Sequence, residues 1–262
     1  MKKLILILLA LTMLATFTAC GKNGGASGET ETKWLVESET YVYKDSAWGT
    51  VTTDFTYDEK GNLLTTSQMA GDEKMEAAYT YDKNGFCTRI EMTQGITTMR
   101  YEITNNKNGN RTKTELYNGN LLMQSINYTY DDDGNLLTQE NANSSYTMVT
   151  KYTYDEQGNM LTATTLVNGT VSSKITLEYD SEGRQIRSVT TDAKGNVTDT
   201  VDATFEGNVE TQVAKDANGN VTGTTVKTMD EHGNVVAIEV SGTSNDYTYT
   251  ATFISIEVPA SK

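Results

Sequence analysis

The chain has 262 residues, of which 37% are hydrophobic, and its formal net charge is −14. This length allows one large domain or two ordinary ones. Such an excess of negative charge repels nucleic acid and anionic lipid headgroups, so no nucleic-acid partner is expected. One Pro stands against 15 Tyr, a composition that argues against a disordered linker and favours β-strands.

The first twenty residues have the pattern of a bacterial export signal. Two lysines at 2–3 precede an apolar run at 4–13 that is too short to span a bilayer comfortably. The sequence FTACG at 17–21 then resembles a lipobox, which implies transfer of lipid to Cys20 and cleavage before it. The alternative is an ordinary signal peptide followed by a chance cysteine.

This pattern predicts three segments and a location. We expect a lipoprotein signal peptide at 1–19, a lipidated Cys20 with a flexible tether at 20–32, and a β-sheet domain at 33–262. The mature chain would be exported, anchored to the bacterial cell membrane through the lipid, and face outward. Cys87 would then have no disulfide partner in the chain, and we expect it to be a small buried apolar residue rather than a nucleophile.

A ten-residue segment recurs through the chain. YTYDEQGNML at 152–161 has close relatives in FTYDEKGNLL at 55–64 and YTYDDDGNLL at 128–137. Its element D-x-x-G occurs eight times, at 58–61, 82–85, 131–134, 155–158, 180–183, 192–195, 216–219 and 230–233. The first six repeats, counting a variant with Asn106 in place of Asp, are spaced 24 or 25 residues apart.

D-x-x-G is the sequence of a hairpin turn. The Asp accepts hydrogen bonds from the backbone N–H groups ahead of it, and the Gly adopts a positive φ. A second turn lies midway in the period, as in VNGTV at 167–171. We therefore predict an all-β fold, an antiparallel hairpin meander of about 16 strands, with 247–258 as the closing strand.

The order of side chains predicts one apolar face, because residues alternate sides along a strand. Continuous alternation places Tyr152 and Tyr154 on one face together with Thr162, Thr164, Leu166 and Val171, and leaves Thr165 on the other. In the first repeat it groups Met69 with Phe55 and Tyr57. In the second repeat Cys87 and Ile90 have opposite parity, which predicts a β-bulge or a slip in register.

An apolar sheet face of this length cannot stay exposed to water. Strand twist favours a sheet that curls into a spiral or an open, barrel-like form. A covering partner or ligand is the alternative.

The run Tyr-x-Tyr-Asp-x-x-Gly-Asn-Leu-Leu resembles the YD repeat of RHS proteins, bacterial wall-associated proteins and teneurins, over most of 50–240. The resemblance implies hairpins that wind into a β-shell, and a role in carbohydrate contact or in enclosing a C-terminal toxin. The chain is far shorter than a full shell of that family. We expect no toxin-like or self-cleaving region after the repeats, so what the resemblance implies for this chain is the hairpin sheet and a binding role.

Catalysis finds little support in the sequence, and no enzyme activity or cofactor is expected. His232 is the one histidine, inside a turn, and most Asp residues occupy turn positions that the backbone requires. Asp131 and Asp133 resemble part of an EF-hand loop, but the bidentate Glu of such a loop would fall at Ala142. No metal site is predicted.

The tyrosines are the candidate ligand-binding residues, because aromatic rings stack on sugar rings while polar neighbours bond the hydroxyls. The candidates are Tyr57, Tyr81, Tyr130, Tyr152, Tyr154 and Tyr179, with Tyr146, Tyr247 and Tyr249 outside the repeated segment. Packing within the sheet is the competing role for these rings. The leading hypothesis is a non-catalytic, surface-anchored scaffold that binds glycan or cell-wall polymer. The alternative is a carrier that holds a lipid or another apolar ligand inside the curled sheet.

Overall fold

The computed structural model describes residues 30–44, 49–142 and 146–259, and the regular elements of these segments are all β-strands. The predicted signal peptide and Cys20 lie outside the described residues. The strands are β1 (Thr30–Tyr43), β2 (Thr50–Tyr57), β3 (Leu63–Ala70), β4 (Glu73–Tyr81), β5 (Cys87–Gln94), β6 (Thr97–Asn105), β7 (Arg111–Asn118), β8 (Leu121–Tyr130), β9 (Leu136–Ala142), β10 (Thr147–Tyr154), β11 (Met160–Val167), β12 (Thr170–Tyr179), β13 (Gln185–Asp192), β14 (Val197–Glu206), β15 (Val209–Asp216), β16 (Val221–Met229), β17 (Val235–Ser241) and β18 (Tyr247–Pro259).

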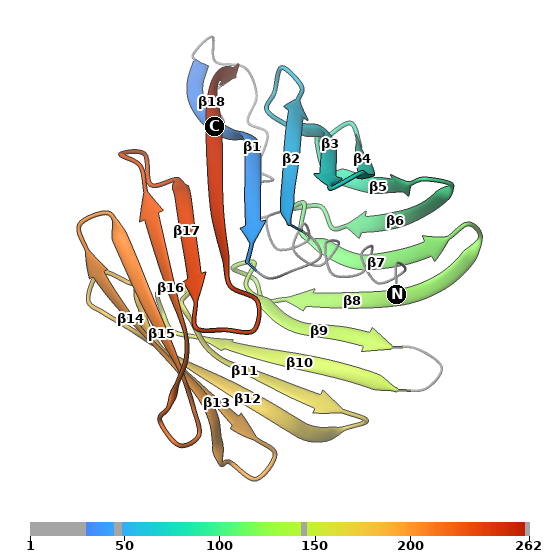
Figure 1. Ribbon diagram of the computed structural model, residues 1–262. Helices are drawn as coiled ribbons and strands as arrows, with labels where there is room; N and C mark the ends of the chain where they lie inside the picture. The colour runs from blue at the N-terminus through green and yellow to red at the C-terminus, as the bar shows by residue number, and fades with distance from the viewer. Residues whose placement is uncertain (1–29, 45–48, 143–145, 260–262) are drawn as a thin grey trace.

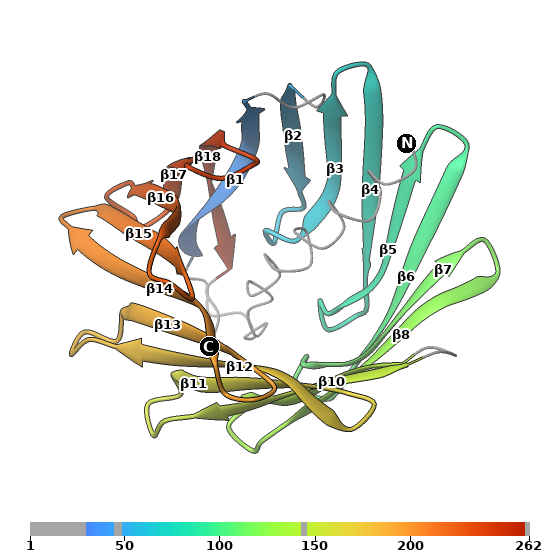
Figure 2. The same ribbon diagram turned by 60° about the horizontal axis from the view of Figure 1, so that its bottom comes forward.

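The strands form one closed ring. Each pairs antiparallel with the next along the chain, and β18 pairs with β1 to complete the circle (Figures 1 and 2). The predicted antiparallel meander is confirmed, and the predicted closing strand is β18. There are eighteen strands in the described residues rather than about sixteen. One reason is that β1 precedes the first D-x-x-G turn, where the repeat gives no signal, and it includes the last three residues of the segment 20–32.

The seam between β1 and β18 continues past the ring as a two-stranded ribbon. β2 pairs with β1 only over residues 38–42, whereas the β1–β18 ladder runs to Thr30 and Pro259. On one side of the ribbon, Ile256 Cδ1 lies 3.3 Å from where a Cβ on Gly61 would stand. On the other side, the ring of Trp34 stacks on His232, with 4.3 Å between the ring centroids. Contacts with two turns, one after β2 and one after β16, thus hold the ribbon.

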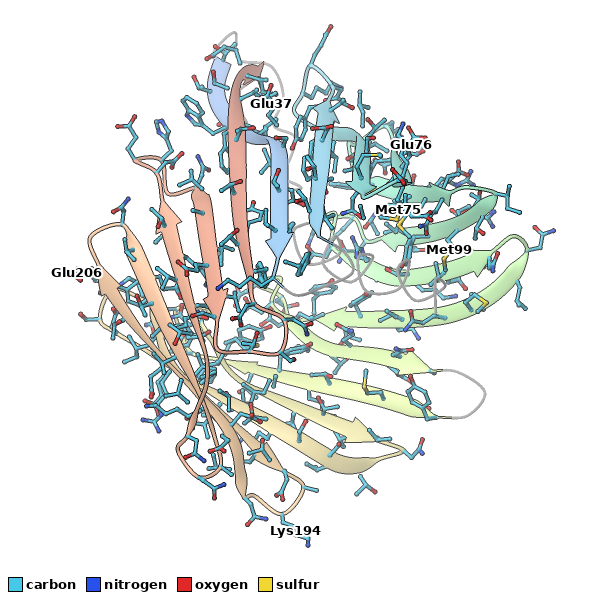
Figure 3. The ribbon with its side chains drawn as sticks, in the orientation of Figure 1. Glu37, Met75, Glu76, Met99, Lys194 and Glu206 are labelled. Atoms are coloured by element: carbon cyan, nitrogen blue, oxygen red, sulfur yellow. The ribbon has the colours of Figure 1, made fainter. Side chains whose placement is uncertain are left out.

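The connections gather at two rims. We call the turns after the even-numbered strands β2 to β16 the YD rim, because the Tyr-Asp turns of the 24-residue repeats lie there. The connections after the odd-numbered strands β1 to β17 form the far rim. Glu206, the last residue of β14 at the YD rim, and Lys194, which follows β13 on the far rim, both point away from the ring (Figure 3).

Each D-x-x-G turn closes on its own backbone. At 155–159 the N–H of Asp155 donates to the carbonyl of Asn159, and the N–H of Gly158 donates to the carbonyl of Asp155. Gly158 has a φ of 85°, a value that a side chain makes costly. The predicted turn chemistry is confirmed at all eight positions, where the same pair of backbone hydrogen bonds recurs.

A β-bulge follows each of the six YD turns from 58 to 184. In the turn at 155–159, Tyr154 pairs with Met160 and Thr153 pairs with Thr162, which leaves Leu161 unpaired. The bulge predicted between Cys87 and Ile90 is therefore confirmed, and it is one of a series. Because a bulge inverts the alternation, faces assigned by continuous alternation are reversed after such a turn only as far as the next irregularity. After the turn at 155–159, the shift between Thr165 and Leu166 restores the assigned faces beyond Val171.

Several predicted faces are accordingly wrong. The hydroxyl oxygens of Thr153 and Thr162 lie 2.8 Å apart, so Thr162 faces away from Tyr152. Thr164, Leu166 and Val171 lie on that same opposite face, whereas Thr165 shares the face of Tyr152. Met69 pairs with Thr52 and is exposed on the face opposite Phe55.

The corrected ring has two distinct faces. The tyrosine face, which includes Phe55, Tyr57, Tyr152 and Tyr154, carries the buried residues of β2–β6. Seven of them, from β4–β6, form an apolar cluster of Ala77, Tyr79, Cys87, Ile90, Met92, Tyr101 and Ile103. The other, threonine face carries paired Thr hydroxyls, such as Thr56 with Thr65, and ion pairs such as Arg89 with Glu102. We infer that the tyrosine face lines the inside of the ring, because a concave wall crowds side chains and charged groups stay in water.

Candidate functional site

Five of the six predicted ligand-binding tyrosines end the strand before a YD turn, and their hydroxyls are already bonded. Each hydroxyl donates a hydrogen bond to a backbone carbonyl of the neighbouring strand, and the two oxygens lie 2.7–2.8 Å apart. The pairs are Tyr57 with Val36, Tyr81 with Leu63, Tyr130 with Arg111, Tyr154 with Leu136 and Tyr179 with Met160. The sequence identified these residues correctly as members of one repeated series. In the structure, the series is a set of hydrogen bonds that hold one strand to its neighbour.

Burial raises the pKa of Tyr57, Tyr130, Tyr154 and Tyr179, to about 12 for Tyr57. Their rings are half-buried, so they act mainly as packing surface. Tyr152, the sixth candidate, lies two residues before Tyr154, and burial first, then the neighbouring Tyr128, raises its pKa. A ligand could reach these side chains only by competing with contacts that the fold already makes.

The turn aspartates are also fully engaged. Asp155 accepts hydrogen bonds through Oδ1 from the N–H groups of Gln157 and Asn159, and through Oδ2 from the Asn159 side-chain amide at 2.9 Å. That amide explains why Asn follows Gly in the repeat. The side-chain bond from Asn159, followed by the backbone bonds, holds the pKa of Asp155 below its ordinary value.

The other seven D-x-x-G aspartates have lowered pKa values as well. Asp131, which resembled a calcium ligand, accepts from the backbone N–H and the side-chain amide of Asn135. In the described segments no three His, Cys, Asp or Glu residues come together as metal ligands. The aspartates therefore serve the turns.

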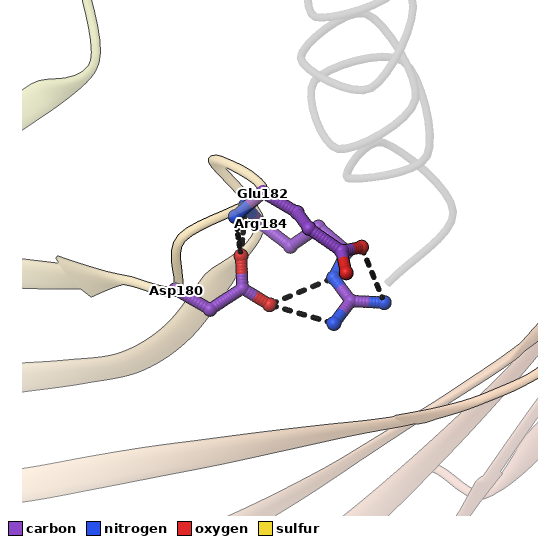
Figure 4. A network of polar contacts seen from close by, with 3 residues as sticks. All are labelled: Asp180, Glu182 and Arg184. Atoms are coloured by element: carbon purple, nitrogen blue, oxygen red, sulfur yellow. Dashed lines mark hydrogen bonds and ion pairs between the residues drawn. The ribbon is translucent and has the colours of Figure 1, made fainter.

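One YD turn replaces the usual Asn with Arg184. Its guanidinium bonds the Asp180 carboxylate at 2.7 Å and reaches Glu182 at 3.4 Å (Figure 4). It also lies over the ring of Phe205, 4.4 Å from the centroid. The Arg thus does what the Asn amide does elsewhere and adds a contact with β14.

Shallow hollows separate neighbouring turns of the YD rim. One, of about 630 Å³, lies between the turns at 155–159 and 180–184 and includes Leu161, Leu177 and Glu178. Another, of about 420 Å³, lies between the turns at 82–86 and 106–110. Their walls are mostly the turn residues themselves, whose polar groups already bond one another.

Aromatic rings gather instead at the seam that closes the ring. Tyr41 and Tyr43 of β1 pair with Tyr249 and Tyr247 of β18. The centroids of Tyr41 and Tyr249 lie 4.9 Å apart, and those of Tyr43 and Tyr247 lie 5.5 Å apart, with the ring planes tilted by 56° and 46°. We call these four residues the aromatic seam. Tyr249 is buried, whereas Tyr43 and Tyr247, which are nearer the far rim, are partly exposed.

A carboxylate adjoins the aromatic seam. Glu39 lies two residues before Tyr41 on the same face and accepts hydrogen bonds from Thr53 and Tyr249. Burial raises the pKa of Glu39, and those two hydrogen bonds oppose the rise. Burial and the charge of Glu39 also raise the pKa of Tyr41 and Tyr249. The seam therefore combines rings that can stack with a carboxylate that can accept hydrogen bonds.

Sequence reasoning found half of this seam. Tyr247 and Tyr249 were candidates, but Glu39, Tyr41 and Tyr43 were missed because they precede the first repeat. The signal was present: Tyr-Val-Tyr at 41–43 matches Tyr-Thr-Tyr at 247–249, and both lie in strands at the ends of the chain. Tyr146, the remaining candidate, is exposed beside the start of β10 on the far rim.

Two other residues weighed in the sequence have packing roles. Cys87 is buried in the cluster of β4–β6, as predicted. His232 stacks on Trp34 and so contributes to the ribbon. No helix in the described segments has the length and apolar character needed to cross a membrane.

The closed ring of hairpins, five of them with a Tyr that bonds the preceding strand and an Asp that closes the turn, has the features of a YD β-shell. The model of the teneurin YD-shell family matches residues 31–250, and the chain belongs to that family. No protein in the curated set matches.

Two solved structures illustrate the similarity. The TcdB2-TccC3-Cdc42 complex is 16% identical, with 79% of this chain and 15% of that chain covered and a TM-score of 0.30. A porin-like protein from Bacteroides uniformis is also 16% identical, with 84% and 98% covered and a TM-score of 0.35. This chain thus spans a small part of the toxin-complex chain.

Proposed function

We propose that this protein is a non-catalytic, exported binding scaffold, held at the cell membrane by lipid on Cys20, that binds glycan or cell-wall polymer at the aromatic seam. The single observation that carries the proposal is the gathering of four tyrosines around Glu39 at the closure of the ring. Aromatic rings stack on the C–H faces of sugars, and a carboxylate accepts hydrogen bonds from their hydroxyls. Tyr43 and Tyr247 retain exposed surface for this contact.

The charge of the chain supports an uncharged or weakly charged polymer as the ligand. A net charge of −14 disfavours nucleic acid and strongly anionic polymers. Tyr57 of the YD rim supports the site indirectly, because its hydroxyl donates to Val36 of β1, a strand that carries the seam. The lipobox-like sequence supports the anchor and the outward location.

The test is a binding panel with the soluble chain 21–262, which retains every strand and lacks Cys20. Peptidoglycan fragments and neutral oligosaccharides are titrated into the chain by calorimetry. We expect saturable binding that weakens at least about tenfold in Tyr43→Ala and Tyr247→Ala. Tyr154→Phe, which removes a hydroxyl from the YD rim, is the matched control and should bind normally.

An absence of binding to every member of the panel would overturn the glycan proposal. Equal losses of affinity in all three variants would show that the binding site is not at the aromatic seam.

A separate observation favours the alternative, a carrier of an apolar ligand. The wall of β4–β6 carries a buried apolar cluster that includes Ile90 and Met92. Native mass spectrometry of the purified chain should then reveal bound lipid, with a loss of that lipid in Met92→Asn.

A further inference from the structure

One hollow of the YD rim departs from the repeat on both of its sides. It has a volume of about 420 Å³ and lies between the turns at 82–86 and 106–110. Asn105 and Asn106 occupy positions where the other five YD turns have Tyr and Asp, and Phe86 occupies a position where those outside its own turn have Asn or Arg. We call this space the amide hollow, because side-chain amides replace the usual phenol and carboxylate in its wall.

The turn at 106–110 closes in the same way as the other YD turns, with the same pair of backbone hydrogen bonds. The Asn105 side chain donates to the carbonyl of Cys87 at 2.8 Å, which replaces the hydrogen bond of a YD-rim tyrosine. The substitutions therefore change the chemistry of the amide hollow and keep the backbone that supports it.

The Asn106 side chain has a donor that the turn does not use. Its Oδ1 accepts hydrogen bonds from the N–H groups of Asn108 and Asn110, so the other atom of this amide is Nδ2. In other YD turns the corresponding Asp accepts the side-chain amide of the Asn that follows the Gly, but two amide N–H groups cannot bond each other. Within the described residues no group bonds the Asn106 Nδ2, so this donor is available to a ligand.

The two hollows of the YD rim differ in charge. The hollow between the turns at 155–159 and 180–184 has four carboxylates in its wall and neither Lys nor Arg. At the positions that correspond to Glu178 and Asp180 of that wall, the amide hollow has Thr104 and Asn106, and Lys107 follows them. The amide hollow thus exchanges carboxylates for a hydroxyl, an amide and a cation.

The sequence around the amide hollow is also basic. Residues 83–113 contain six Lys or Arg and two Glu, in a chain with a net charge of −14. Lys107 forms no ion pair among the described residues. Asp82 is the one carboxylate in the wall, and its Oδ1 accepts the N–H groups of Asn84 and Phe86 from its own turn. An anion is therefore repelled less here than over the acidic remainder of the chain.

Phe86 and Ile103 give the amide hollow an apolar side. The Phe86 ring is half-buried and lies against Gly109, where an added Cβ would stand 2.4 Å from it. Ile103 lines the hollow and belongs to the buried cluster of β4–β6. A cation and an amide donor beside an apolar surface match a ligand that carries a carboxylate next to an apolar side chain.

We propose that the amide hollow binds the C-terminal residue of a short peptide, with the terminal carboxylate bonded to Lys107 and Asn106 and an apolar side chain against Phe86. The ammonium and amide N–H groups donate to the carboxylate, and such charge-assisted bonds are roughly twice as strong as neutral ones. A long acyl chain fits less well, because a shallow hollow would leave most of it in water. The proposal goes beyond glycan binding at the aromatic seam, which lies on β1 and β18, and either site can be lost without the other.

Calorimetric titration of the acetylated tripeptide Ala-Ala-Leu into the soluble chain 21–262 at low salt tests the proposal. We expect saturable binding of the peptide with a free C-terminal carboxylate. The same peptide with an amidated C-terminus lacks the charge and should bind at least about tenfold more weakly.

Two substitutions in the wall should each weaken binding of the free acid at least about tenfold, Lys107→Gln by loss of the cation and Asn106→Asp by repulsion. Asn106→Asp introduces the residue of the other YD turns, so the fold should be retained, and thermal unfolding by circular dichroism verifies this. Lys60→Gln, which removes a lysine from another YD turn, is the matched control and should bind the peptide normally.

No binding of the free acid, equal binding of the amidated peptide, or binding unaffected by both wall variants would overturn the proposal. Galacturonate and inorganic phosphate test the other anions that the same groups attract. If either binds more tightly than the peptide and loses affinity in Lys107→Gln, the amide hollow belongs to an acidic sugar or a phosphate group instead. Tyr43→Ala, a variant of the aromatic seam, should leave peptide affinity unchanged, and a loss there would place the peptide at the seam and overturn this assignment.

Discussion

The YD rim and the far rim are built from the same strands. They differ in how many of their side chains already make contacts within the fold. On the YD rim, Asp155 is bonded by its own turn and Tyr154 donates to Leu136. On the far rim, Tyr43 and Tyr247 retain exposed surface, and Ile96 packs on nothing within its own hairpin tip. The repeated residues therefore build the shell, and the residues that depart from the repeat are the ones left for binding.

Acid is expected to have the largest effect of all, because it acts on eight aspartate turns at once, six on the YD rim and two, after β13 and β15, on the far rim. The turn aspartates have lowered pKa values in the folded chain, so their stabilisation is complete above the unfolded value of about 3.9. It is lost as the pH falls through the folded values. Urea unfolding midpoints measured from pH 7 to pH 2 should fall steeply below pH 4.

Asp155→Asn is the matched variant for the acid experiment, because Asn106 already occupies the equivalent position of another turn. It should make the dependence on pH shallower and leave the fold intact. A midpoint that is constant down to pH 2 would contradict the role given to the turn carboxylates.

Glycine substitutions compare the two rims directly. Gly109 on the YD rim and Gly119 on the far rim both have positive φ. A Cβ at Gly109 would lie 2.4 Å from Phe86, whereas at Gly119 it would meet nothing within 4 Å. We expect Gly109→Ala to cost about 3 kcal/mol, from strain and overpacking together, and Gly119→Ala about 1 kcal/mol, from strain alone. Both free energies of unfolding are to be measured by chemical denaturation. Equal losses in the two variants would mean that the turns of the YD rim are not packed on one another.

Loss of one tyrosine hydroxyl at the YD rim is expected to lower the stability by a smaller amount. Tyr154→Phe keeps the ring and removes the hydroxyl that donates to Leu136 at 2.8 Å. The free energy of unfolding should fall by about 1 kcal/mol, the usual net worth of one such bond. An unchanged unfolding curve would show that water replaces the hydroxyl at no cost.

The smallest effect is expected at an exposed leucine of β8. Leu122→Asn replaces an exposed side chain, so the free energy of unfolding should change by less than about 0.5 kcal/mol, as measured by chemical denaturation. A loss of several kcal/mol would show that Leu122 packs within its own ring.

The repeat made most of the fold predictable. Asp and Gly three residues apart specify a hairpin turn by local chemistry, and their period specified a sequential antiparallel sheet. The faces were harder, because the bulge at Leu161 has no residue type of its own and shifts the alternation by one. Closure of the ring could not be predicted from the repeat either, because it depends on pairing between β1 and β18 at opposite ends of the chain.

The candidate site was predictable only in part, for the same reason. Tyr154 and its equivalents were conspicuous because they recur, and recurrence turned out to accompany a backbone contact. Tyr41 and Tyr43 do not recur, and their partners in β18 are about 200 residues away. Their contact is set by ring closure, which no local pattern encodes.

Hydrogen–deuterium exchange in the presence of a peptidoglycan fragment tests most directly whether the ligand binds at the aromatic seam, outside the repeated segments. The account predicts slower amide exchange at residues 39–43 and 247–251 when the fragment is present, and unchanged exchange at the turn 155–159. Protection of that YD turn together with Tyr154, and none at the aromatic seam, would contradict it.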